Sequence, residues 1–276
     1  MSFTDITERL EAAKKIAKTS GAMIKEKQLS ELGTSFKGKS DVVTLMDLES
    51  ERIIKNYLHE QFPSDNFQGE ETGIERYGDG GTWIIDPIDG TNNYVHGIAG
   101  YTISIAYETE KYVPLLGVVY SPVHDDLYWA VRGRGAYRNE TRITCSSQSE
   151  VKDALTIISP PLRYPHFIDT YSEMIRRMCI ETGDVRDFGS AALHLSYVAD
   201  GKADCYFEYG LKYHDVAAGF VIVSEAGGRL SFFEPEIKFS GNIIVTNNQL
   251  HLWYTSVVRE IYQKGGSRIE NEKVFL

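Results

Sequence analysis

The sequence predicts a layered fold of mixed α and β structure, built from two halves that meet near residue 148. Three observations support this prediction. Amphipathic helical patterns open the chain, short strands separated by turns fill residues 83–132, and strands alternate with helices after residue 150. We therefore expect an α+β half over residues 1–148 and an α/β half over residues 149–276.

In the first half, apolar residues recur at helical spacing over residues 4–27 and 45–62, and Pro63 ends the second helix. A short run of apolar residues at 83–85 indicates a buried strand. Further strands, separated by turns, should form a largely antiparallel sheet with it. They are expected at residues 101–107, 112–120 and 126–132.

In the second half, glycines at 201 and 227 mark the ends of two predicted helices. We expect helices at 167–182, 190–200 and 214–226, and strands at 155–159, 185–188, 204–208 and 243–246. The polar residues 265–276 are expected to form a frayed end.

Composition limits the classes of function. The chain has 276 residues and a formal net charge of −10, which argues against a nucleic-acid polymer or an anionic membrane as the main partner. An anionic substrate is still possible, because bound metal ions invert the local field. Three cysteines without CxxC spacing indicate reduced thiols. With no apolar run long enough for a membrane span, and no hydrophobic signal core, we expect a cytoplasmic protein.

The most informative segment is Asp86-Pro87-Ile88-Asp89-Gly90-Thr91. It places two carboxylates where the predicted strand ends, followed by a glycine that permits close approach of a ligand. Residues 91–93 can open a helix whose first N–H groups are free. Clustered carboxylates bind hard cations and free amides bind phosphate, so the segment predicts a metal-dependent phosphate site. The alternative is an ordinary turn followed by a helix cap.

Three other acidic segments can complete such a site. Glu70 and Glu71 lie in a loop that begins at Gly69, and Asp215 and Asp47 each lie near the start of a predicted helix. Taken singly, the two glutamates are typical of surface charge and the two aspartates of helix caps. Taken together with residues 86–91, they form a set of oxygen ligands suited to Mg²⁺.

These segments resemble the inositol monophosphatase family over about residues 10 to 250. The matching motifs are WIIDPIDGTNNY (83–94), YHDVAAGFVIVSEAGG (213–228), GEET (69–72), VVTLMD (42–47) and DFGSAALHLSYVADGKAD (187–204). The resemblance implies an αβαβα sandwich and a lithium-sensitive phosphomonoesterase that uses two or three Mg²⁺ ions. It also makes a homodimer plausible.

The resemblance further assigns roles at the metals. The metal ligands would be Glu70, Asp86, Asp89, Asp215 and the backbone carbonyl of Ile88. Thr91, hydrogen-bonded to Asp47, would orient and deprotonate the attacking water, with Glu70 taking part in catalysis. Glu71 would lie beside the metal cluster in a supporting role.

At the substrate, Gly90 and Thr91 would bind the phosphate through backbone N–H groups. Asp89 and Asp215 would also contact the substrate. Gly189, Ser190 and Ala191 would line the leaving-group side, and Glu208 would contact a substrate hydroxyl. The chain departs from the family at His214, where a Trp is usual. We interpret this as a change of packing in preference to a new base or metal ligand.

The predicted function is therefore Mg²⁺-dependent hydrolysis of a small phosphate monoester, with inositol 1-phosphate as the first candidate. Fructose 1,6-bisphosphatase, NADP(H) phosphatase and 3′(2′),5′-bisphosphate nucleotidase activities are alternatives within the same superfamily. A catalytically silent binding protein is the alternative from another class. The full set of carboxylates argues against it, because mutually repelling acids bring no benefit to a protein that only binds.

Overall fold

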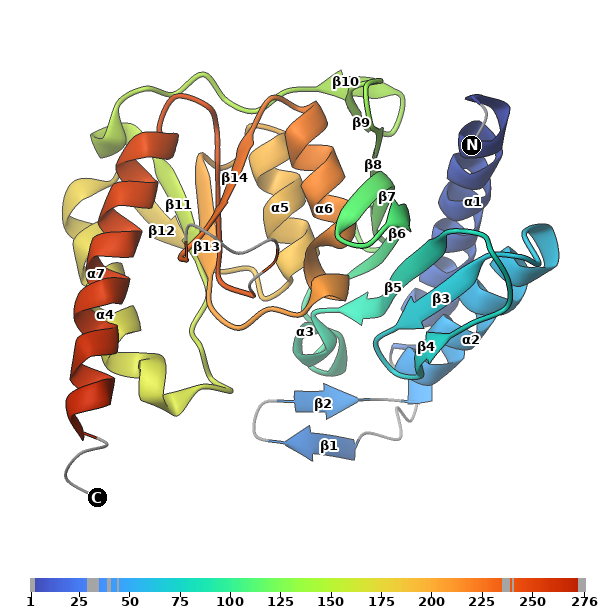
Figure 1. Cartoon of the computed structure of the whole chain (residues 1–276), viewed down its shortest axis with the longest axis horizontal. Helices are drawn as coiled ribbons and strands as arrows, with labels where there is room; N and C mark the ends of the chain where they lie inside the picture. The colour runs from blue at the N-terminus through green and yellow to red at the C-terminus, as the bar shows by residue number, and fades with distance from the viewer. Residues whose placement is uncertain are drawn as a thin grey trace.

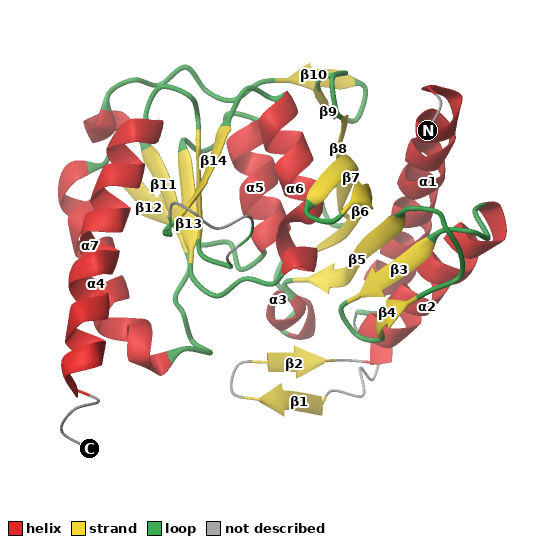
Figure 2. Ribbon diagram, viewed as in Figure 1, coloured by secondary structure: helices red, strands yellow, loops and turns green. Residues whose placement is uncertain are grey.

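The computed structural model describes residues 3–28, 35–38, 41–43, 45–234, 239 and 241–272. Within these ranges, helices and two large sheets alternate in five layers (Figure 1). The order is α1 and α2, an eight-stranded sheet, α5 and α6, a five-stranded sheet, and α4 and α7 (Figure 2). The predicted αβαβα sandwich is confirmed.

The first layer consists of α1 (Phe3–Lys27) and α2 (Leu45–Gln61), at the positions predicted from helical periodicity. Their apolar stripes pack on one face of the eight-stranded sheet, where Ile24, Ile54 and Leu58 are buried. Burial of these stripes fixes the side of α2 that faces the sheet. The polar residues on that same side therefore also point toward the interior.

The eight-stranded sheet has the order β10-β9-β8-β7-β6-β5-β3-β4. The pairing of β3 with β5 is parallel and its other pairings are antiparallel, which confirms the predicted, largely antiparallel meander. Its strands are β3 (Asn66–Gly69), β4 (Gly73–Glu75), β5 (Thr82–Asp89), β6 (Thr102–Glu110), β7 (Val113–Ser121), β8 (Asp126–Val131), β9 (Ala136–Arg138) and β10 (Thr141–Ile143). Four of these, β3, β4, β9 and β10, were not predicted. Nor was the separate ribbon of β1 (Ser35–Gly38) and β2 (Asp41–Val43).

The central layer consists of α5 (Ala191–Ala199) and α6 (Tyr213–Glu225), which lie between the two sheets. Small residues allow α6 to approach its neighbours closely. A Cβ at Gly219 would lie 2.4 Å from Leu195 of α5, and a Cβ at Gly117 of β7 would lie 2.3 Å from the carbonyl oxygen of Ala218. This close packing fixes α6, whose first turn carries Asp215, between α5 and the first sheet.

The five-stranded sheet has the order β12-β11-β13-β15-β14. Its strands are β11 (Leu155–Ile158), β12 (Asp184–Arg186), β13 (Cys205–Glu208), β14 (Arg229–Phe232) and β15 (Ile243–Thr246). β11 is parallel to both of its neighbours, whereas β15 is antiparallel to β13 and β14. All but β14 were predicted. We keep the proposed division of the chain near residue 148, which lies between β10 and β11.

The outer layer consists of α4 (Ile168–Glu181) and α7 (His251–Glu272). Helix α7 was not predicted, and the expected frayed end is wrong as far as residue 272. Residues 273–276 lie outside the described part of the chain. Burial of Tyr254, Val258 and Ile261 anchors α7 to the sheet, and this packing supports a helix despite the paired glycines at 265 and 266.

Candidate active site

The strand that carries the first acidic motif is longer than predicted. β5 includes Asp86 and ends at Asp89, so the strand continues beyond its predicted end at residue 85, and the two acids lie within its last residues. The pairing with β6 shifts between them: Asp86 lies opposite Ser104 and Asp89 opposite Thr102. Three steps along β5 thus match two along β6, which is a β-bulge. The bulge accommodates Pro87, which has no N–H for the sheet.

Gly90 turns the chain from β5 into the short helix α3 (Thr91–Val95). Its φ of +91° lies in the left-handed region, where glycine is favoured. The hydroxyl of Thr91 lies 3.1 Å from Asp47 Oδ1 and 2.9 Å from the carbonyl oxygen of Ile88. Its single proton serves one of these acceptors at a time. The predicted Asp47–Thr91 contact is therefore present in the structure.

Glu70 and Glu71 lie in the turn between β3 and β4, as the loop prediction required. The N–H of Glu70 donates to the carbonyl oxygen of Ile85 on β5 (3.1 Å), which ties the turn to the strand that carries Asp86. Because β3 and β5 are parallel, the end of β3 and the acidic end of β5 lie on the same side of the sheet.

Asp215 lies in the first turn of α6 and accepts a 2.6 Å hydrogen bond from the backbone N–H of Lys212 through Oδ2. It is the third residue of the helix and accepts from the backbone of the N-cap, Lys212, so the simpler interpretation of Asp215 as the N-cap itself is wrong, although the carboxylate does satisfy an N–H group at the helix start. It also lines the same cavity as Asp86 and Asp89. The bond from Lys212 uses only Oδ2, so Oδ1 of Asp215 is left for a role at the cavity.

Asp89 joins the two halves of the chain. Its Oδ2 accepts hydrogen bonds from the hydroxyl of Ser190 and from the N–H of Ala192, each at 2.6 Å. Ser190 also accepts from the N–H of Leu193 and so caps α5. The Asp89 carboxylate thus lies at the positive end of the α5 dipole. These contacts join residues about a hundred positions apart.

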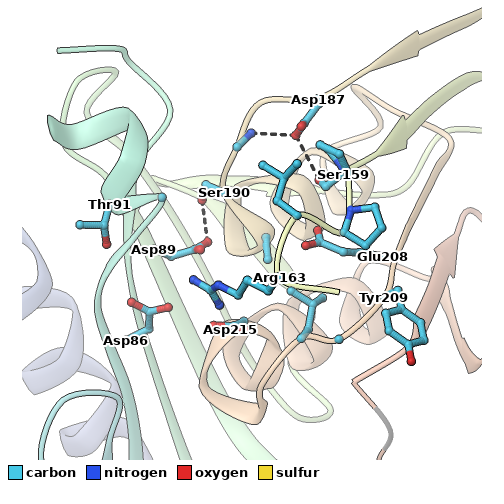
Figure 3. Close-up of a pocket in the computed structure, with 18 of the residues that line it drawn as sticks. Asp86, Asp89, Thr91, Ser159, Arg163, Asp187, Ser190, Glu208, Tyr209 and Asp215 are labelled. Atoms are coloured by element: carbon cyan, nitrogen blue, oxygen red, sulfur yellow. Dashed lines mark hydrogen bonds between the residues drawn. The ribbon is translucent and has the colours of Figure 1, made fainter. Parts of the chain in front are cut away.

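Most of the predicted site residues converge on one cavity of about 220 Å³. Figure 3 shows Asp86, Asp89 and Thr91 on one side of it and Glu208 and Tyr209 on the other. The predicted residues that line it are Glu70, Asp86, Ile88, Asp89, Gly90, Thr91, Gly189, Ser190, Ala191, Glu208 and Asp215. Asp47 and Glu71 are not among the lining residues. Asp47 is connected to the cavity through Thr91, and Glu71 is adjacent in the chain to Glu70.

The acids on one side of the cavity perturb one another. Burial, and then the negative charges of Glu70 and Asp89, raise the pKa of Asp86. Burial and Asp215 raise the pKa of Asp89 to about 7, against the opposing effect of its bond from Ser190. Burial and Glu70 raise the pKa of Asp215 to about 7. The chain thus places carboxylates together with too little positive charge to balance them.

This donor set fits a hard divalent cation. Its members are oxygen ligands, and a bound cation would offset the repulsion that raises the three pKa values. No group of three or more His, Cys, Asp or Glu side chains in the described ranges is placed so that it could hold an ion as it stands. The fit to a metal therefore rests on the oxygen donors and on the clustered negative charge of the carboxylates. To coordinate an ion together, these side chains would have to rotate toward it.

Sequence reasoning missed much of the opposite wall. After β11, the segment 159–164 forms part of this wall and brings Arg163 to the cavity. The carboxylate of Asp187, also on this wall, accepts hydrogen bonds from Ser159 Oγ (3.0 Å) and from the Gly189 N–H (2.9 Å). Glu208 accepts a bond from the hydroxyl of Tyr206, and burial raises its pKa to about 8. Asp187 lay inside the strand predicted at 185–188, whereas β12 ends at Arg186, so the residue instead follows the strand. The available signal was that Asp187 opens the motif 187–204.

His214 is buried beside the acidic residues. Its Nε2 lies 3.7 Å from Glu70 Oε1 and 3.5 Å from Asp215 Oδ1, and it has no hydrogen-bond partner among the described residues. Burial lowers its pKa, and the charge of Glu70 only partly opposes this. The neighbouring Tyr213 instead donates to Glu108 from its hydroxyl. The Nε2 of His214 is thus buried between Glu70 and Asp215 without a hydrogen bond to the described part of the chain, and the expected packing role of the ring stays a prediction.

Comparison with known proteins decides the family. The model of the inositol monophosphatase family matches residues 5–263. The chain belongs to this family. Family members are metal-dependent phosphatases of small phosphate esters, which agrees with the acidic cavity described above. None of the helices in the described part of the chain combines the length and apolarity that a membrane span requires.

Relatives in the family carry more than one name. The chain is 38% identical to the Nus factor SuhB of Haemophilus influenzae over 217 residues, which cover 78% of this chain and 81% of the relative. It is 36% identical to a fructose-1,6-bisphosphatase/inositol-1-monophosphatase of Thermotoga maritima over 233 residues (84% and 88% of the two chains).

Solved structures of family members have the same fold. The extragenic suppressor protein SuhB of Bartonella henselae superposes with a TM-score of 0.86 at 32% identity, covering 91% of this chain and 98% of that one. An IMPase of Thermotoga maritima superposes with a TM-score of 0.85 at 34% identity, covering 94% and 99%. The comparisons thus establish both the family and the fold.

Proposed function

We propose that this chain hydrolyses a small phosphate monoester with the help of Mg²⁺, and that inositol 1-phosphate is its first candidate substrate. The observation that supports this most directly is the convergence of Asp86, Asp89, Asp215, Thr91 and Ser190 on one cavity. The proposal includes a cytoplasmic homodimer that uses two or three Mg²⁺ ions and is inhibited by lithium.

Each proposed ligand comes from an element that the fold holds in place. Glu70 follows β3, Asp86 and Asp89 lie on β5, and Asp215 opens α6. Together with the carbonyl oxygen of Ile88 they would hold the ions. When bound, Mg²⁺ neutralises the phosphate, lowers the pKa of bound water and stabilises the leaving oxygen.

The chain's own groups would then place the reactants. With its proton donated to Asp47, the Thr91 hydroxyl presents a lone pair that accepts a hydrogen bond from the attacking water and orients it. Asp47, buried at the start of α2, is the acceptor through which Thr91 acts. Gly90 and Thr91 would bind the phosphate through backbone N–H groups. Glu70 would assist catalysis, and Glu71 would support the ligand set.

The opposite wall would receive the leaving group. Gly189, Ser190 and Ala191 line it at the start of α5, and Asp89 and Asp215 border it on the acidic side. With a pKa raised to about 8, Glu208 carries a proton at neutral pH and can both donate to and accept from a substrate hydroxyl. Each hydroxyl of a polyol can likewise donate and accept, which favours inositol phosphate.

Arg163 favours a second candidate, a sugar bisphosphate such as fructose 1,6-bisphosphate. Its side chain reaches into the cavity between the acidic residues and Glu208 (Figure 3). A guanidinium group in this position suits a second phosphate group of the substrate. The proposal that NADP(H) or an adenosine bisphosphate is the substrate is supported by family membership alone.

Phosphate release from inositol 1-phosphate, fructose 1,6-bisphosphate, NADP and adenosine 3′,5′-bisphosphate tests these proposals in one assay. We expect no turnover in EDTA, recovery with Mg²⁺, and the highest kcat/KM with inositol 1-phosphate. Undiminished turnover after exhaustive removal of metal would disprove the metal-dependent mechanism. A preference for the sugar bisphosphate that is lost in Arg163→Gln would establish the second candidate in place of the first.

A further inference from the structure

One face of helix α2 contacts three separate segments of the candidate active site. Near its start, Asp47 accepts from the Thr91 hydroxyl, as described above. Ser50 Oγ donates to the carbonyl oxygen of Pro87, inside the bulge of β5 (3.1 Å). Glu51, the next residue, reaches the turn after β3. Positions 47, 50 and 51 are spaced i, i+3 and i+4, so they share one helix face.

Glu51 holds the turn after β3 through its backbone. Its carboxylate is buried, and Oε2 accepts from the N–H of Glu71 at 2.9 Å. Oε1 accepts from the N–H of Thr72 at 3.1 Å and from the Thr72 hydroxyl. Gly69 makes this approach possible, because a Cβ there would lie 2.3 Å from Glu51 Oε1. Three charge-assisted bonds thus fix the turn to α2.

The charge of Glu51 is balanced within this cluster. Lys55 Nζ, one helical turn further on, lies 3.7 Å from Glu51 Oε1 and donates to both Thr72 Oγ1 and Glu75. Lys55 is itself buried. The Glu51 carboxylate is thus already satisfied by the chain, unlike the acids in the cavity. Its role is therefore to bind protein, and not an ion or a substrate.

We propose that Glu51 is a positioning residue that holds Glu70 at the cavity by fixing the backbone of the turn after β3, an inference that rests on the function proposed above. The backbone of the turn is fixed on both sides of the Glu70 side chain. The Glu70 N–H is bonded to Ile85 on β5, and the next two N–H groups are bonded to Glu51. Without Glu51 the turn would keep only the first of these ties, and Glu70 would lose its fixed direction toward the metals.

The test compares Glu51→Gln with Asp65→Asn. Asp65 is a matched control, since it is equally buried and accepts bonds from Arg9 and Trp83, but it precedes β3 whereas Glu70 follows it. Mg²⁺ binding to the metal-stripped proteins is measured by calorimetry without substrate. We expect affinity to fall about 10- to 100-fold in Glu51→Gln, as for groups that orient metal ligands. Asp65→Asn should bind Mg²⁺ within about twofold of wild type, although both variants lose thermal stability.

The outcomes separate this inference from the proposed function. Wild-type Mg²⁺ affinity in Glu51→Gln would show that Glu51 only supports the fold. If the unmodified protein binds no Mg²⁺ and releases no phosphate, it is the proposed function that fails.

If Glu51→Gln does not fold, Thr72→Val decides. Thr72 is exposed, and the change removes the bonds of its hydroxyl with Glu51 and Lys55 but keeps both backbone N–H bonds to Glu51. We expect roughly threefold weaker Mg²⁺ binding, the size of one hydrogen bond, and no change in the exposed control Thr141→Val. Equal affinities in these two variants would overturn the inference.

Discussion

Two buried acidic regions lie at opposite ends of the parallel strands β3 and β5. At the start of β3, Asp65 accepts two bonds from the Arg9 guanidinium, at 2.9 and 2.8 Å, and one from Trp83 Nε1 at 3.1 Å. At the other end, Asp86 and Asp89 are buried beside further carboxylates, and their pKa values are raised. The first region is neutralised by the chain itself. The second leaves charge for a bound ion to neutralise.

The largest expected effect is the difference between substituting one acid in each of these two regions. Asp89→Asn should lower kcat roughly 10²-fold or more, because it removes one proposed ligand charge at the metals. Without metal, its free energy of unfolding should stay near the wild-type value, since repulsion with Asp215 is relieved. Asp65→Asn should do the opposite, keeping kcat but costing about 3 kcal/mol of stability, as expected when a buried ion pair is broken.

Steady-state kinetics at saturating Mg²⁺ and urea unfolding in EDTA measure both quantities for each variant. Near-normal turnover in Asp89→Asn would mean that this acid serves only to join β5 to α5. A large stability loss in both variants would show that the two regions are energetically alike.

The second prediction tests the contact between α2 and α3 at the acidic end. Thr91→Ala should lower kcat more than it raises KM, because the hydroxyl acts on water in the transition state. Asp47→Asn should give a similar loss, about 10- to 100-fold. The double variant should be little worse than either single one, as expected of residues that act as a unit. Fully additive losses in single-turnover assays would contradict the proposed Asp47–Thr91 pair.

The third prediction uses the raised pKa values. Asp89 and Asp215 have pKa values of about 7 in the fold, against about 3.8 in the unfolded chain. Between these values the folded protein binds more protons than the unfolded one, so stability without metal should fall as pH rises from about 4 to 7. Saturating Mg²⁺ should flatten this dependence. Urea unfolding at pH 5 and 7.5, in EDTA and in Mg²⁺, gives the four values, and a metal-free stability that rises with pH would refute the explanation.

The sequence predicted the acidic end of the cavity well, because its signals are local. Asp86 to Thr91 form one short segment. Glu70 and Asp215, which taken singly are typical of surface charge and of a helix cap, became informative through their combination with this segment. Helices α1 and α2 and strand β15 also match their predicted ranges closely. Strong periodicity over many residues, or a compact apolar run between turns, determines such elements without help from distant parts of the chain.

The rest depends on packing between distant residues. Strands β3, β4, β9 and β10 have three or four residues each, too few to establish a period. Arg163 carries no local sign that its loop borders the acids. The bonds from Ser190 and Ala192 to Asp89 span about a hundred positions. Only the stacking of the two halves creates these contacts.

The smallest expected effect concerns the wall opposite the acids. Because its pKa is raised to about 8, Glu208 is neutral at pH 7, and the isosteric Glu208→Gln should change the KM for inositol 1-phosphate little at that pH. As the pH passes 8, wild-type Glu208 gains a charge that repels the substrate phosphate. The wild-type KM should then rise on the order of fivefold, corresponding to about 1 kcal/mol between partly solvated charges. The KM of Glu208→Gln should stay flat from pH 6.5 to 9. A KM that rises equally in both proteins would assign the titration to another group, and a large loss already at pH 7 would show that Glu208 binds the substrate as a carboxylate.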